Sequence, residues 1–231
     1  MKHSDLPAAA IHFQPRSKTE LVRPFCEVVG EPSRGELYLE RAARMPKGWP
    51  LSFFGMFRGR PGSPLRVCGY LDEDVRAECA KNPSALAAAL DEIGFEAYDD
   101  AMLAQISKLM DATPGLVDFQ LDVKPDGTLS NMLAFDFQFD IVQPELVRSE
   151  FADGKAAGVM SLLESWGAAD SRWKLAADAV FARAIPVELE NGTIGRFGFT
   201  LMPQWAKARW RNGTLETAKL YYLGNANLIA G

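Results

Sequence analysis

The stretch that decides the fold is "LVDFQLDVKPDGTLSNMLAFDFQFDI", residues 116–141. From 117 to 124 apolar side chains occupy the odd positions and polar ones the even positions, and a similar alternation returns from 133 to 140. A period of two is the pattern of a half-buried β-strand. Pro125-Asp126-Gly127 between the two runs has turn chemistry. We therefore predict an antiparallel hairpin with one apolar and one polar face.

A second hairpin is predicted near the C-terminus, in "WAKARWRNGTLETAKLYYLG", residues 205–224. Asn212-Gly213 favours a type I′ turn, because both central positions of that turn need positive φ. A two-residue loop places Arg209 opposite Glu216, which predicts a cross-strand ion pair.

The same pairing predicts how the remaining side chains of this hairpin divide between its faces. Lys219 and Tyr221 fall on one face with Trp210, and Lys207 falls on the other. Two groups of cations are therefore expected, of which the group with Lys219 and Tyr221 has no carboxylate to balance it.

Strand pairs alternate with helix pairs along the rest of the chain. Further strands are predicted at 35–42, 49–59 and 65–71, and helices at 18–30, 72–82, 83–94, 98–115, 143–154, 154–167 and 171–184. Short turns between adjacent strands predict an antiparallel sheet, with helices against its apolar face. We expect an α+β protein with an N-terminal arm at residues 1–17 and a single domain at 18–231.

The composition limits the classes of function. The chain has 231 residues, of which 48% are hydrophobic and 24% charged, as in a soluble globular protein. A formal net charge of −5 argues against general binding of nucleic acid. The sequence has neither an apolar run of membrane-spanning length nor the apolar core of a signal peptide, and its three cysteines are scattered. We expect a cytoplasmic protein with reduced thiols and no membrane partner.

The polar face of the sheet could serve in two ways. In an open sheet it faces water, whereas in a barrel with helices outside it lines a wet central chamber. Short polar groups suit such a lining, and the strands carry Asp118, Gln120, Asp122, Asp136 and Gln138 there. The sequence is compatible with both arrangements, a curved open sheet and a closed barrel.

Two strands present a cation and a phenol on one face. Arg66 and Tyr70 lie in "LRVCGYL", and Lys219 and Tyr221 lie in "AKLYYL". Guanidinium, ammonium and phenol groups together could bind an anion such as a diphosphate.

These strand–turn–strand units resemble the repeats of ABBA-type aromatic prenyltransferases. The resemblance rests on "SFFGMFRGRPGSPLRVCGYL" and "GFTLMPQWAKARWRNGTLETAKLYYLG", and the closing "LETAKLYYLG" is also similar to peptide prenyltransferases of cyanobactin biosynthesis. It covers about a quarter of the chain through loose motifs. Members of that family close helix–strand repeats into a barrel and are usually longer, with ten strands, whereas we expect seven or eight here.

The resemblance implies transfer of an isoprenyl group from an allylic diphosphate to a peptide or aromatic acceptor, as in natural product biosynthesis. Cations and phenols would hold the diphosphate, aromatic and polar groups would line the prenyl site, and one carboxylate would orient the acceptor. The expected diphosphate ligands are Arg66, Tyr70, Lys124, Lys219 and Tyr221. The expected lining is Tyr38, Phe53, Gln138 and Trp210. The candidate catalytic carboxylates are Asp118, Asp136 and Glu40.

No metal or cofactor is expected beyond the isoprenyl diphosphate co-substrate. "YDDAML" has Leu103 where an Asp-Asp-x-x-Asp magnesium motif would need its third aspartate. This difference suits a Mg-independent barrel enzyme better than an isoprenyl synthase.

Two other functions remain open. A curved sheet with a polar concave face could bind a peptide or protein partner without catalysis. A hydrolase or lyase could use Asp118 and Asp136 as paired carboxylates, although both residues also suit a passive lining.

Overall fold

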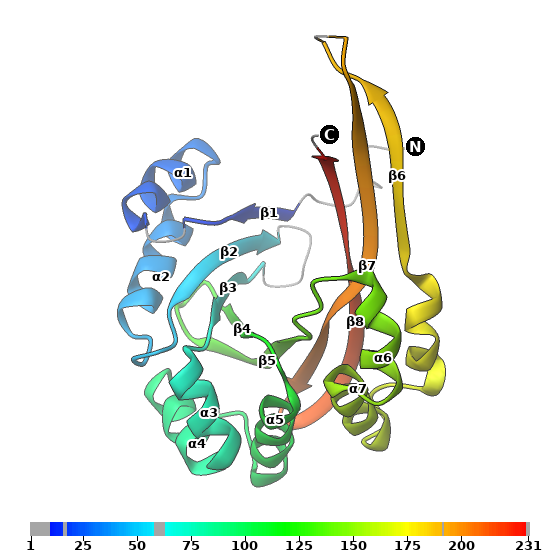
Figure 1. The fold of residues 1–231 in the computed structure, drawn as a ribbon. Helices are drawn as coiled ribbons and strands as arrows, with labels where there is room; N and C mark the ends of the chain where they lie inside the picture. Colours follow the sequence, from blue (N-terminus) through cyan, green and yellow to red (C-terminus); the bar gives the residue numbers. More distant parts are fainter. Residues whose placement is uncertain (1–9, 16–17, 58–62, 191, 230–231) are drawn as a thin grey trace, which may run out of the picture. The chain divides into compact units, whose positions relative to one another are not determined.

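The fold is an α+β arrangement, as the sequence predicts. The computed structural model describes residues 10–15, 18–57, 63–190 and 192–229, and Figure 1 traces them. Their strands are β1 (Ala10–Phe13), β2 (Leu51–Phe57), β3 (Leu65–Tyr70), β4 (Val117–Val123), β5 (Leu129–Gln138), β6 (Phe181–Glu188), β7 (Ile194–Arg211) and β8 (Thr214–Ile229). Their α-helices are α1 (Val22–Val28), α2 (Pro32–Ala43), α3 (Glu73–Lys81), α4 (Pro83–Glu92), α5 (Asp100–Ala112), α6 (Val147–Ala152) and α7 (Lys155–Ser165), with 3-10 helices η2 (Thr19–Leu21), η3 (Pro144–Leu146) and η4 (Ser171–Ala179).

The eight strands form one sheet in the order β1-β2-β3-β4-β5-β7-β6, and β8 pairs with β7 beside this path. The pairs β1–β2, β2–β3, β3–β4 and β6–β7 are antiparallel. The expected antiparallel sheet is therefore confirmed. Whether it closes into a barrel stays a prediction.

The chain divides into two compact units, which are described separately. Unit 1 comprises Met1–Asp111, Val117–Phe135 and Arg209–Glu216. Unit 2 comprises Ala112–Leu116, Asp136–Ala208 and Thr217–Gly231. Strands β5, β7 and β8 each contribute residues to both units.

The core of unit 1 lies between the helices and the apolar face of the sheet. Phe54 pairs with Val67 on this face, and the Tyr38 ring of α2 lies 4.8 Å from the Phe54 ring. Further along the sheet, the rings of Trp49 and Phe119 are 5.0 Å apart. Each of these five side chains is at most 1% exposed, so helices do cover the apolar face.

The prediction of a strand at 35–42 is wrong, because these residues belong to helix α2. Glu, Leu, Arg and Ala in this segment are good helix formers, and Pro32 stands in the first turn. The buried residues Gly35, Tyr38 and Arg41 recur every three positions, as one face of a helix does.

The N-terminal arm is in part a strand. Residues 10–13 form β1, which pairs with β2 from Ala10 opposite Phe57 to Phe13 opposite Phe54. The Phe13 ring stacks on the Phe25 ring of α1, with centroids 4.0 Å apart. Residues 1–9 and 16–17 of the expected arm, and the end of the 49–59 strand, lie outside the described residues.

Unit 2 has aromatic packing of its own between its helices and the residue that follows β5. The Phe139 ring lies 5.4 Å from Phe151 of α6, which lies 6.4 Å from Trp173 of η4. β6 and β7 form a long ribbon, with Phe181 opposite Leu201 (Figure 1). The prediction of a helix at 171–184 is thus wrong beyond Ala179, because residues 181–188 form a strand that pairs with β7.

Both predicted hairpins are present. Asn212 and Gly213 have φ of 50° and 78°, the positive values that a type I′ turn needs. In the central hairpin the Lys124 amide donates to the Thr128 carbonyl at 2.8 Å, and Gly127 has φ of 82°. The helices of the described residues are too short or too polar to cross a bilayer.

Candidate functional site

The polar face of β3 and β4 lies in unit 1. Arg66 pairs with Asp122, Cys68 with Gln120 and Tyr70 with Asp118, so these side chains share one face of the sheet. The prediction that Arg66 and Tyr70 share one face of their strand is therefore confirmed. Cys68 is 1% exposed, which is the environment of a structural thiol.

Arg66 is held in a fixed position on this face. Its Nε and Nη2 donate to Oδ1 and Oδ2 of Asp122 at 2.8 and 3.0 Å. Its guanidinium carbon also lies 5.1 Å from the centroid of the Phe57 ring. Both side chains of the ion pair are largely buried, with 16% and 12% exposed. This environment strengthens their attraction relative to a surface pair.

A cavity of about 700 Å³ opens beside this ion pair. Four cations and two carboxylates line it, so its local charge is positive. The lining residues are Pro64, Arg66, Asp122, Lys124, Pro125, Asp126, Ser130, Met132, Arg209 and Arg211. Charged side chains and the apolar Pro64, Pro125 and Met132 thus line one cavity.

Sequence reasoning missed two cations of this cavity. Arg209 and Arg211 both contact the Glu216 carboxylate, with Nε–O distances of 2.8 and 3.1 Å. The predicted Arg209–Glu216 pair is thereby confirmed, but the cavity that both arginines line was not foreseen. The available signal was their spacing of two on β7, which places both on one face.

The turn after β4 supplies another cation and a carboxylate. Lys124 and Asp126 are exposed, and both line the cavity. The Asp126 Oδ1 accepts hydrogen bonds from the Thr128 hydroxyl and amide at 2.7 and 2.9 Å. These bonds lower the pKa of Asp126, so its charge is fixed near neutral pH.

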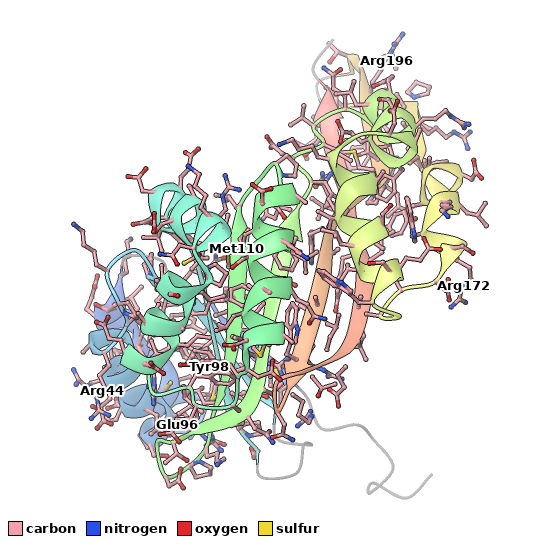
Figure 2. All side chains as sticks on the ribbon, turned by 90° about the horizontal axis from the view of Figure 1, so that it is seen from below. Arg44, Glu96, Tyr98, Met110, Arg172 and Arg196 are labelled. Carbon is pink, nitrogen blue, oxygen red and sulfur yellow. The ribbon has the colours of Figure 1, made fainter. Side chains whose placement is uncertain are left out.

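A second cavity of about 530 Å³ lies on the helix side of unit 1. Arg44 and Glu96, both labelled in Figure 2, are among its lining residues. Arg41 also lines it but is committed to the backbone, because it donates to the carbonyls of Ile93 and Gly127 at 2.7 and 2.8 Å. Glu40 of α2 lines a smaller cavity of about 220 Å³ with Arg44.

The proposed lining residues occupy different faces. Phe53 pairs with Cys68 and so shares the face of Arg66. Tyr38 contacts Phe54 on the opposite, apolar face. Trp210 is fully buried, and its indole N–H donates to Gln105 of α5 at 2.9 Å. Tyr38 and Trp210 are therefore parts of the helix-covered core of unit 1.

Unit 2 holds a separate cluster of polar and aromatic side chains. The Lys207 Nζ lies 3.3 Å from Asp136 Oδ2 and 5.3 Å from the centroid of the Tyr221 ring. Trp205 stacks on Tyr221, with centroids 5.4 Å apart and planes 9° apart. The prediction that Lys207 and Tyr221 occupy opposite faces is thus wrong.

The remaining candidates of unit 2 are Lys219 and Gln138. Lys219 is exposed on β8. Gln138 is half-buried at the end of β5, where its backbone N–H donates to the Leu116 carbonyl at 3.0 Å. Because Arg66 belongs to unit 1, convergence of Lys219 and Tyr221 with Arg66 stays a prediction.

Among the described residues, no three His, Cys, Asp or Glu side chains are grouped as metal ligands would be. The comparisons with known proteins found no matching family model, no similar curated protein and no similar solved structure.

Proposed function

We propose that this protein is a prenyltransferase, which moves an isoprenyl group from an allylic diphosphate to a peptide or aromatic acceptor without Mg²⁺. The observation that carries the proposal is the cavity of unit 1, in which Arg66, Lys124, Arg209 and Arg211 surround about 700 Å³. Two of these cations, Arg66 and Lys124, were expected from the sequence to bind diphosphate. The antiparallel α+β sheet suits an ABBA-type barrel, and closure of that barrel belongs to the proposal.

Charge is the first support. A diphosphate in a protein is held by several cationic donors, and guanidinium groups match its oxygens in pairs. Three arginines and one lysine line the cavity, against the carboxylates of Asp122 and Asp126 in its lining and of Glu216, which contacts Arg209 and Arg211. Because Asp122 already binds Arg66, the ion pair orients that guanidinium before the ligand arrives.

The apolar wall is the second support. Met132 and Pro64 line the same cavity as the cations, and the Phe57 ring lies against Arg66. An allylic diphosphate has an anionic head and an apolar tail, so it requires both kinds of surface within one site.

The reaction would proceed at the carbon that bears the diphosphate. The C1–O bond breaks, its electron pair leaves with the diphosphate, and the cations stabilise the negative charge that develops there. The acceptor atom forms a bond to C1, and its proton passes to a carboxylate. Asp118 is our choice in unit 1, because it lies on the face of Arg66 at the other end of β4.

The first test is thermal melting in EDTA with dimethylallyl, geranyl and farnesyl diphosphate. A ligand at 100 times its Kd stabilises the fold by about 2.7 kcal/mol. For a chain of this size we expect a rise in Tm of roughly 5–10 °C. Inorganic diphosphate and geraniol, tested alone, separate the contributions of head and tail.

Matched variants locate the binding site. The double variant Arg66→Met/Asp122→Leu removes a cation of the cavity and the carboxylate that it neutralises, and should abolish the shift. Lys108→Ala removes an exposed cation of α5 that does not line the cavity, and should retain it. If none of the three allylic diphosphates shifts the Tm of the wild type, the proposal fails. Binding of a peptide partner without catalysis would then be the function to examine.

A further inference from the structure

Glu216 joins the two arginines that β7 contributes to the cavity of unit 1. The Arg211 Nε donates to Glu216 Oε1 at 3.1 Å, and the Arg209 Nε lies 2.8 Å from Glu216 Oε2. One carboxylate thus contacts both guanidinium groups, each through its Nε atom. The two groups therefore lie side by side.

This arrangement of two cations depends on the carboxylate. Arg209 and Arg211 are two residues apart on one strand, so their side chains extend from the same face. Two like charges held close together repel each other, and flexible side chains would separate into the solvent. Glu216 offsets part of this repulsion and fixes both side chains by their Nε atoms.

The terminal nitrogens of both arginines remain available to a ligand. Within the part of the chain that the structure describes, the Nη atoms of Arg209 and Arg211 donate no hydrogen bond to the protein. Both arginines line the cavity, whereas the described residues that line it do not include Glu216. The carboxylate thus contacts the guanidinium groups from outside the cavity, and an anion can bind without displacing it.

Arg66 has a different share in the same cavity. Its Nε and Nη2 already bind Asp122, which itself lines the cavity. More of the donors for an anionic ligand must therefore come from the two arginines of β7.

We infer that Glu216 is a positioning residue, which holds Arg209 and Arg211 as a paired receptor for two adjacent phosphoryl groups. A guanidinium group binds the oxygens of a phosphoryl group in pairs, so two such groups side by side match a diphosphate. A single phosphate would engage only one of them. The inference rests on the proposed function, because it assigns the head group of the same ligand to these two arginines.

The test is calorimetric titration of the whole protein with inorganic diphosphate and with inorganic phosphate, in EDTA at constant ionic strength. The wild type should bind diphosphate roughly tenfold more tightly than phosphate, or better. Glu216→Gln keeps the size of the side chain and removes its charge. It should weaken diphosphate binding roughly tenfold, although it removes a negative charge beside an anion site.

Asp126→Asn is the matched control for charge. Asp126 lines the cavity and accepts its hydrogen bonds from Thr128, and asparagine keeps that acceptor oxygen. Removal of this charge should tighten diphosphate binding a few-fold, because less negative charge opposes the ligand. Positioning therefore predicts opposite signs for the two variants, whereas charge alone predicts the same sign.

A double-mutant cycle shows whether Glu216 acts through the arginines. In the background Arg209→Gln/Arg211→Gln, the further change Glu216→Gln should no longer weaken diphosphate binding. The side chain of Glu216 is 38% exposed, and ion pairs at such positions contribute little to stability. Circular dichroism and Tm check that every variant folds.

Three results would overturn the inference. They are a wild type that does not prefer diphosphate to phosphate, a Glu216→Gln variant that binds diphosphate as tightly as the wild type or more tightly, and a loss that persists without the two arginines. The transferase proposal fails separately, if inorganic diphosphate binds as expected but no allylic diphosphate does. Allylic diphosphates that bind wild type and Glu216→Gln equally well would overturn this inference alone.

Discussion

Arg66 and Asp122 face each other across β3 and β4, joined by two hydrogen bonds of 2.8 and 3.0 Å. Both side chains are less than one-fifth exposed and line the cavity of unit 1. A pair of this kind does not by itself stabilise a fold much, because desolvation opposes the attraction. Its presence in a positively charged cavity is better explained by orientation of the arginine.

The first prediction concerns this pair. Arg66→Met should destabilise the protein by about 3 kcal/mol, because Asp122 keeps its charge without its partner. The double variant Arg66→Met/Asp122→Leu should be close to wild type in stability, since apolar residues replace both charges. Urea unfolding at neutral pH measures the differences. A double variant as unstable as the single one would show that the pair contributes to stability.

The second prediction concerns Arg41. Its guanidinium links α2 to the Ile93 and Gly127 carbonyls and is only 7% exposed. Arg41→Met keeps much of the side-chain length but leaves two buried carbonyls without their charged donor. We expect a loss of roughly 3–6 kcal/mol, from about 1.5–3 kcal/mol for each of the two bonds. Arg44→Met, at an exposed position of the same helix end, should change the unfolding free energy by less than about 0.5 kcal/mol.

The third prediction concerns two glycines. A Cβ on Gly69 would lie 2.6 Å from Phe119 Cζ and closer still to the Pro50 carbonyl oxygen. Gly69→Ala should therefore destabilise by about 1–3 kcal/mol or more, because the backbone must shift. Gly158 lies in α7, where a Cβ would meet no atom within 4 Å. Gly158→Ala should raise the unfolding free energy by about 0.5–1 kcal/mol. Thermal melting distinguishes the two outcomes.

The fourth prediction is loss of stability at alkaline pH. Burial is the main cause that raises the pKa of Cys26 and of Cys79 from 9.0 to about 11, and that of Tyr38 from 10.0 to about 12. In the unfolded chain these groups lose their protons at lower pH than in the folded protein. The contribution of these groups to the free energy of unfolding is therefore complete below about pH 9. It falls as the pH rises through the folded-state pKa values of about 11 and 12. Each group should lower the unfolding free energy by about 1.4 kcal/mol per pH unit within its own interval.

Urea unfolding at pH 8, 9, 10 and 11 measures this slope. Cys79→Ala should make the slope between pH 9 and 11 shallower, although it also lowers stability at pH 8 through the cavity that it leaves. Native Cys26 and Cys79 should react with a thiol reagent at pH 8 only at the rate of unfolding. Rapid labelling of either thiol in the folded protein would contradict the prediction.

Local patterns in the sequence were sufficient for both hairpins. A period of two over residues 117–123 and a turn signal at Asn212-Gly213 act within a few residues of the chain, so no distant contact is needed to specify them. The same locality explains why the Arg209–Glu216 pair could be predicted from a two-residue loop.

Predictions that depended on distant contacts were less successful. Residues 35–42 were predicted as a strand, yet they form a helix, with Gly35 packed against Cys26 of α1. Residues 181–184 continue a helical pattern, but pairing with β7 makes them a strand. Trp210 was placed in the site because of its residue type, whereas packing against Phe135 and a bond to Gln105 keep it in the core.

The sequence by itself determined the α+β class, the antiparallel hairpins and the polar face that carries Arg66, because these follow from the order and period of neighbouring residues. Only the tertiary structure decided which cations share a cavity. Arg66, Lys124 and Arg209 are separated by up to 143 residues along the chain and meet because β3, β4 and β7 belong to one sheet. The pairing of distant strands depends on burial and backbone hydrogen bonds that no local pattern contains.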